Sequence, residues 1–107
     1  MTLSISTGTG SAGEPVIALD GDLDQTTAAG LREALADALE AKPAAVHVDL
    51  TRVTFIDSSG LGALVRAHQY ALGLGCRLTL DGVSDTLYER LQIAGVADLL
   101  AVRGPTT

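Results

Sequence analysis

Residues 44–65 read AAVHVDLTRVTFIDSSGLGALV, and within this stretch the spacing of apolar residues changes from that of a strand to that of a helix. In residues 44–50, β-branched side chains alternate with other residues, which predicts a strand with one buried face. Its apolar face carries Val46, Val48 and Leu50. Residues 51–55 are expected to form a short connection to the helix.

The second half of the stretch predicts a helix from Ser58 to about residue 72. At about 100° per residue, one side of this helix is apolar. That side carries Leu61, Leu64, Val65, His68 and Leu72. The same helical phase places Ser58 beside this face, in line with Gly62, Arg66 and Gln69. Ser59 is expected to point away from the core.

Before this stretch, residues 24–42 show the apolar spacing of another helix, which Asp24, Thr26 or Thr27 can cap. Gly30 within this helix would be explained by a close approach between helix and sheet. A strand at residues 15–21 precedes the helix. A short edge strand around Leu3 and Ile5 and a Gly-rich loop at residues 7–14 come before that strand.

After the central stretch, we expect a strand at residues 76–80, a helix at 84–95, a short strand at 96–102 and a frayed tail at 103–107. Ser84 is expected to cap the last helix. The order β-β-α-β-α-β-α-β predicts a single α/β domain over residues 1–107. Its sheet would be small and mostly parallel, with four or five strands, an antiparallel N-terminal edge and three or four helices. The pattern leaves open whether the helices cover one face or both.

Composition excludes several classes of function. The net charge is −6, with 13 acidic and 7 basic residues, which argues against nucleic-acid binding. No apolar stretch reaches the length of a membrane span, and the N-terminus lacks the pattern of a signal peptide, so we expect a cytoplasmic protein that does not contact membrane.

The single cysteine, Cys76, is expected to be buried and inert. Without CxxC or HExxH motifs, neither a metal nor a cofactor is expected.

The segment DSSGLG, residues 57–62, permits several interpretations. A serine hydrolase would need a base near the serine, but His47 is on a strand and His68 lies ten residues along the same helix. A phosphate-binding loop would lack the GxxxxGK[ST] motif and would place Asp57 against the anion. We therefore expect no catalytic activity and no permanent binding site for a phosphate group.

Two interpretations of the serines remain open. Asp57, Ser58 and Ser59 are all good caps for a helix start. Alternatively, Ser58 accepts a phosphate, which the helix N-terminus tolerates, and the added charge blocks a partner that fits the neutral hydroxyl. Gly60 and Gly62 would then let the backbone of that partner approach closely.

Three segments together carry a resemblance to a known family: ALDGDLDQTTAAGLREAL, VHVDLTRVTFIDSSGLGALV and CRLTLDGVSDTLYERLQIAGVADLL. They are similar to the bacterial anti-sigma factor antagonists of the STAS family. The resemblance implies a binding protein without enzymatic activity, a monomer or weak dimer. Its partner would be an anti-sigma factor that is a serine kinase with a histidine-kinase-like ATP site. A PP2C-type phosphatase would reverse the phosphorylation.

The resemblance also assigns roles to residues. Ser58 would be the phosphate acceptor, with Asp57 beside it and Asp24 near it. The contact surface would include Ser59, Gly60, Leu61 and Gly62, and helical phase adds Arg66. Asp22 stands where glutamate is commoner in the family, and HQYALGLG lacks the lysine that relatives often carry. The alternative is a STAS accessory domain of a transport or sensory assembly, which would bind a protein, a small anion or a nucleotide.

Overall fold

The computed structural model describes residues 2–95 and 101–102 of the 107-residue chain. These residues form a five-stranded sheet in the order β1-β2-β3-β4-β5, with β1 antiparallel to β2 and every other pair parallel. The strands are β1 (Leu3–Thr9), β2 (Pro15–Leu23), β3 (Ala45–Ile56), β4 (Arg77–Asp81) and β5 (Ala101–Val102). The helices are α1 (Ala28–Leu39), α2 (Ser58–Gly73) and α3 (Asp85–Ile93). The predicted fold class is confirmed.

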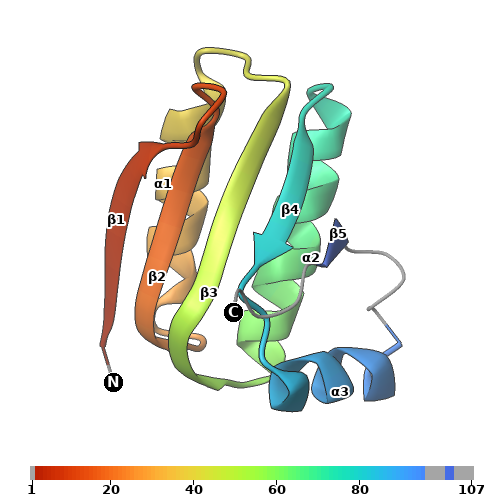
Figure 1. The fold of residues 1–107 in the computed structure, drawn as a ribbon. Helices are drawn as coiled ribbons and strands as arrows, with labels where there is room; N and C mark the ends of the chain where they lie inside the picture. The colour runs from red at the N-terminus through yellow and green to blue at the C-terminus, as the bar shows by residue number, and fades with distance from the viewer. Residues whose placement is uncertain (1, 96–100, 103–107) are drawn as a thin grey trace.

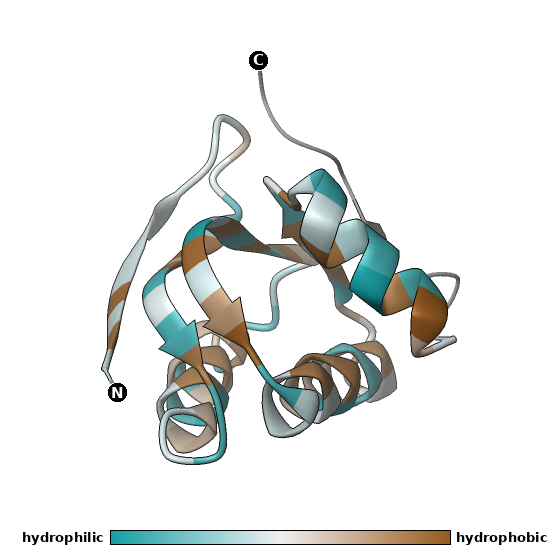
Figure 2. Cartoon of the chain, turned by 90° about the horizontal axis from the view of Figure 1, so that it is seen from below, coloured by the Kyte–Doolittle hydropathy of each residue, from teal (hydrophilic) through white to brown (hydrophobic). Residues whose placement is uncertain are grey.

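The helices divide between the two sides of the sheet. Helices α1 and α2 lie side by side behind the sheet in Figure 1, whereas α3 lies in front of it, at the end of β4. Figure 2 shows the same division from below. The aliphatic core fills the space between the sheet and the pair α1 and α2. Its largest fully buried side chains include Ile17, Leu19, Leu23, Leu31, Leu35, Val46, Val48, Leu64, Leu78 and Leu80.

Helix α1 buries Leu31, Leu35 and Leu39, which recur every four residues on one face. The helix begins at Ala28, four residues later than predicted, because the residues before it form a hydrogen-bonded turn. Gly30 allows the predicted close approach. A Cβ at this position would lie 3.1 Å from Cδ1 of Ile5 on β1.

Strand β3 is longer than predicted. The expected connection at residues 51–55 is wrong, since these residues continue the strand to Ile56. The reason is that β2 also runs past its predicted end to Leu23 and supplies backbone partners, such as Asp22 for Phe55. The pairing has two register shifts. The carboxyl ends of both strands therefore lie at the end of the sheet where α1 and α2 begin.

The two ends of the chain follow the predicted order of elements, and the N-terminal loop is shorter than predicted. Strand β1 continues to Thr9, which pairs with Pro15, so the predicted loop at residues 7–14 is three residues too long. The predicted cap of the last helix is confirmed, because Oγ of Ser84 accepts a hydrogen bond from the Leu87 amide at 3.1 Å. Residues 101–102 form a strand as predicted. Residues 96–100 and the predicted frayed tail lie outside the described residues.

Candidate functional site

The DSSGLG segment forms the junction between β3 and α2. Asp57 is the N-cap residue, and its Oδ1 accepts a hydrogen bond from the Gly60 amide at 2.8 Å. The Asp57 amide donates to the main-chain oxygen of Leu23 at 3.3 Å. Such a cap contributes about 1 kcal/mol to the stability of a helix. Asp57 therefore fills the capping role, and neither serine is needed for it.

The two serines differ in exposure. Ser58, the first residue of α2, is exposed, and Ser59 is half-buried. The expectation that Ser59 points away from the core is therefore wrong. The packed face of α2 is made mostly of small residues, which let the helix lie close to the sheet. It consists of Gly60, Ala63, Leu64, Ala67 and Ala71.

This packed face is rotated from the predicted one. Leu72 was assigned to the core but is 62% exposed, and Leu61 and Val65 are only partly buried against the core. The sequence prediction followed the largest apolar side chains, whereas the close helix–sheet contact selects alanine and glycine. The rotation leaves Ser58 on the side of the helix that faces solvent.

Gly60 is not accessible at the surface, so the prediction that it contacts a partner is wrong. It is buried, and a Cβ at this position would overlap the main-chain oxygen of Leu23 and lie 2.8 Å from Cγ1 of Ile56. A glycine is required at this position because the contacts inside the protein leave no room for a Cβ. Gly60 thus holds the start of α2 against the ends of β2 and β3.

Gly62 and Arg66 lie one and two turns along α2 from Ser58. Gly62 is half-buried, and the guanidinium of Arg66 lies over it. A Cβ at Gly62 would be 3.1 Å from Nη1 of Arg66. The Arg66 side chain therefore runs back along the helix toward Ser58, the usual direction for a long helical side chain. Ser58, Ser59, Gly62 and Arg66 form a continuous surface along α2, with Leu61 beside it.

Asp24 lies in the turn between β2 and α1 and is 5% exposed. Its Oδ1 accepts hydrogen bonds from the Thr26 hydroxyl at 2.7 Å, the Thr26 amide at 2.9 Å and the Thr27 amide at 3.2 Å. These bonds, led by that from the Thr26 hydroxyl, hold the pKa of Asp24 below its usual value. Because Asp24 is buried, little of it is accessible to a partner. Its main contribution to the site is to fix this turn beside the start of α2.

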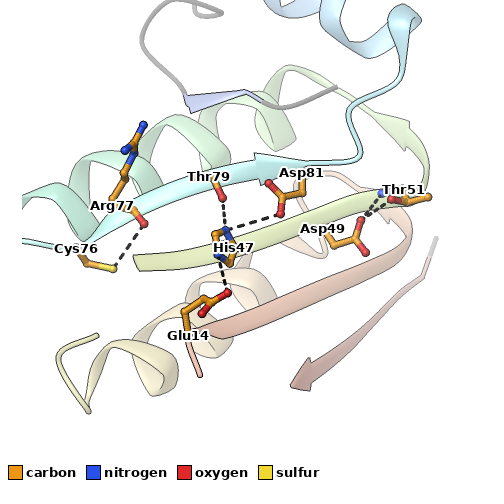
Figure 3. A network of polar contacts seen from close by, with 8 residues as sticks. All are labelled: Glu14, His47, Asp49, Thr51, Cys76, Arg77, Thr79 and Asp81. Carbon is orange, nitrogen blue, oxygen red and sulfur yellow. Dashed lines mark hydrogen bonds and ion pairs between the residues drawn. The ribbon is translucent and has the colours of Figure 1, made fainter. Parts of the chain in front are cut away.

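The two histidines lie away from Ser58. His47 alternates with the buried Val46 and Val48, so it points to the face of the sheet opposite α1 and α2. There its ring hydrogen-bonds the Thr79 hydroxyl and lies 3.3 Å from Oε1 of Glu14 and 3.7 Å from Oδ2 of Asp81 (Figure 3). No local pattern in the sequence predicts this cluster, because strand register brings its members together, pairing His47 with Thr79.

The second histidine, His68, is half-buried on α2, and its Nδ1 atom is buried without a hydrogen-bond partner. Within residues 2–95 and 101–102, no group of three His, Cys, Asp or Glu side chains is arranged to hold a metal ion. Cys76 is buried as predicted, and burial raises the pKa of its thiol, which disfavours the reactive thiolate.

Comparison with known proteins identifies the family of this chain. The family model described as "Mlab, STAS domain" matches residues 7–101. The chain belongs to the STAS domain family. It is 32% identical over 83 residues to the anti-sigma-B factor antagonist of Listeria monocytogenes, covering 78% of this chain and 73% of the relative.

Two further comparisons concern a transport protein and a solved structure. The chain is 33% identical over 85 residues to the intermembrane phospholipid transport system binding protein MlaB of Escherichia coli, covering 78% of this chain and 84% of MlaB. In fold it matches the crystal structure of an anti-sigma factor antagonist from Mycobacterium paratuberculosis with a TM-score of 0.83 and 22% identity. The match covers 98% of this chain and 87% of that one. None of the described helices is long and apolar enough to cross a membrane.

Proposed function

We propose that this protein is an anti-sigma factor antagonist whose binding is switched off by phosphorylation of Ser58. The observation that carries the proposal is the division of roles at the start of α2. Asp57 accepts the capping hydrogen bond from Gly60, while Ser58 is exposed beside it. A kinase can therefore modify Ser58 without removing the cap that holds the helix.

A phosphate on Ser58 changes the surface and leaves the fold intact. It adds a charge of about −1.5 to −2 at neutral pH, next to the carboxylate of Asp57. Its position in the first turn is favourable for a negative charge by about 0.3–1 kcal/mol, because of the helix dipole. A partner that fits the neutral hydroxyl would meet a bulky anion and lose affinity by repulsion and desolvation.

The partner in this proposal is an anti-sigma factor that is also a serine kinase, with a histidine-kinase-like ATP site. The unphosphorylated protein binds it and releases a sigma factor. The kinase then phosphorylates Ser58, and a PP2C-type phosphatase restores the free hydroxyl. The protein contributes only the exposed serine and the surface around it, as expected of a cytoplasmic regulatory protein without an enzymatic activity of its own.

The proposal is tested with purified anti-sigma factors of this class from the same genome. Each is incubated with ATP and wild type, Ser58→Ala or Ser59→Ala, and phosphate is located by mass spectrometry. We expect phosphate in the wild type and in Ser59→Ala but not in Ser58→Ala. Binding measured by calorimetry should be lost in Ser58→Asp. Equal phosphorylation of all three proteins would refute the assignment of Ser58.

A second candidate function is that of a binding subunit in a transport system. It is favoured by the description of the matching family model and by the 33% identity to MlaB. Co-purification of the native protein distinguishes the two. An anti-sigma factor that is lost with Ser58→Asp supports the antagonist. Transport subunits that are retained equally by wild type and Ser58→Asp support the alternative.

A further inference from the structure

A groove runs between α1 and α2 on the side of these helices that faces away from the sheet. Its volume is about 390 Å³. The floor is apolar and deeply buried at Leu31 and Leu35, whereas Tyr70 on the rim is 55% exposed. The apolar residues that line most of it are Ala28, Leu31, Leu35, Ala63, Ala67 and Tyr70.

The charged side chains that line the groove are both arginines, Arg32 on α1 and Arg66 on α2. Both residues are exposed, and within the described part of the chain neither forms an ion pair with an acidic side chain. The whole chain has a net charge of −6 and only 7 basic residues. Two unpaired arginines at one apolar groove of an acidic protein therefore favour a ligand that is apolar and carries negative charge.

The groove is continuous with the surface around Ser58. Arg66 lines the groove, while its guanidinium lies over Gly62, one turn from Ser58. Helices α1 and α2 both begin at the same edge of the sheet, as Figure 1 shows. A partner that covers Ser58 therefore has the groove directly beside its contact.

The length and the charges of the groove indicate which kind of ligand it binds. On α1 the lining runs from Ala28 to Ala36, a length of about 12 Å at 1.5 Å per residue, or roughly two helical turns. A helix of the partner with apolar residues at intervals of three and four fits such a groove. A second copy of this chain does not, since a two-fold contact at the groove would bring the arginines of both copies together.

We infer that the groove between α1 and α2 binds an amphipathic helix of the anti-sigma factor, with carboxylates of that helix paired to Arg32 and Arg66. The inference rests on the proposed function and adds a second contact to the one at Ser58. The contact at Ser58 is sensitive to phosphate. The groove supplies affinity and selects partners by their acidic, apolar surface.

The test uses the anti-sigma factor that binds the wild type in the calorimetric assay. Arg66→Glu reverses one groove charge, and Arg52→Glu is its matched control, because Arg52 is an exposed arginine on β3 with 79% of its side chain accessible. Ala36→Trp fills the groove, and Gln92→Trp places the same side chain at an exposed position of α3, on the other side of the sheet and outside the lining. Thermal unfolding verifies that all four variants fold.

We expect Arg66→Glu and Ala36→Trp to weaken binding about tenfold or more, and both controls to bind within about twofold of the wild type. A photo-crosslinking residue at position 36 should attach to a helical segment of the anti-sigma factor that contains Asp or Glu. Attachment to a basic segment would refute the stated chemistry.

The outcomes separate this inference from the proposed function. Loss of binding in Ser58→Asp with normal binding in both groove variants overturns the groove and leaves the switch in place. Normal binding in Ser58→Asp with weak binding in both groove variants overturns the switch and leaves the groove as the interface. A wild type that binds no anti-sigma factor overturns both.

Discussion

Gly60 in the first turn of α2 lies directly against the main-chain oxygen of Leu23 at the end of β2. The same oxygen accepts the hydrogen bond from the Asp57 amide at 3.3 Å. Since Leu23 leads into the turn before α1, the two strand-to-helix connections meet at this one atom. Ser58 is therefore presented from a junction that is tightly fixed on its inner side.

Gly60→Ala should destabilise the protein by about 1–3 kcal/mol, the usual cost of forcing extra volume into a packed site. The added Cβ would overlap the Leu23 oxygen, and this oxygen is backbone and cannot move aside easily. Urea-induced unfolding measures the change. The matched control is Gly73→Ala at the other end of α2, where a Cβ has open space and should stabilise by up to about 1 kcal/mol. Equal stability of Gly60→Ala and wild type would contradict the packing described here.

Asp57→Ala should cost about 0.5–2 kcal/mol, because the Gly60 amide loses the acceptor that caps α2. Asp57→Asn keeps a side-chain oxygen at the same place and should retain most of the stability. Chemical denaturation followed by circular dichroism compares the two variants. If Asn is as damaging as Ala, the negative charge of Asp57 and not its capping bond is what the helix requires.

Asp24 should make stability depend on acid. Its pKa is lower in the folded protein than its usual value of 3.8, chiefly through the Thr26 hydroxyl. Asp24 therefore contributes stability that is fully present above that value and is lost as the pH falls through the lower folded pKa. The free energy of unfolding of Asp24→Asn, measured from pH 7 downward, should fall less steeply in acid than that of the wild type.

Thr26→Val tests the cause of this shift, because it removes the hydroxyl and keeps both backbone amides that bind Asp24. Its acid dependence should lie between those of wild type and Asp24→Asn. An acid dependence identical to that of the wild type would mean that the backbone amides and the Thr27 hydroxyl lower the pKa without the Thr26 hydroxyl.

A phosphate placed on Ser58 should be influenced by Arg66, whose guanidinium lies over Gly62 one turn away. A nearby positive charge favours the doubly ionised phosphate, so Arg66 should lower its second pKa, against the opposite effect of the neighbouring Asp57 carboxylate. Phosphorus NMR of protein with genetically encoded phosphoserine at position 58 measures this pKa. Arg66→Gln should raise it, and Arg52→Gln, on β3, should leave it unchanged. The same pKa in all three proteins would show that Arg66 does not reach the phosphate.

Local signals in the sequence predicted the order of the elements well. The cap at Ser84 and the regular leucines of α1 depend on residues a few positions apart, and both were identified from the chain. The extension of β3 was missed because it depends on β2 continuing beside it past the strand end predicted at residue 21.

The site was predicted less completely than the fold. Asp57 and Ser58 were assigned from the local motif. The burial of Gly60 and the half-burial of Ser59 follow from how closely α2 approaches the sheet, which helical phase alone does not specify. The cluster around His47 and the groove between α1 and α2 each combine residues from separate elements, so no local pattern contains them.

The order of strands in the sheet has a consequence for how the protein is made. Each strand from β2 to β5 pairs with the strand that precedes it in the chain. During synthesis, the hairpin of β1 and β2 is complete first, and every later strand finds its neighbour already in place. Every pairing in the sheet therefore joins strands that follow one another in the sequence, an arrangement that favours rapid folding.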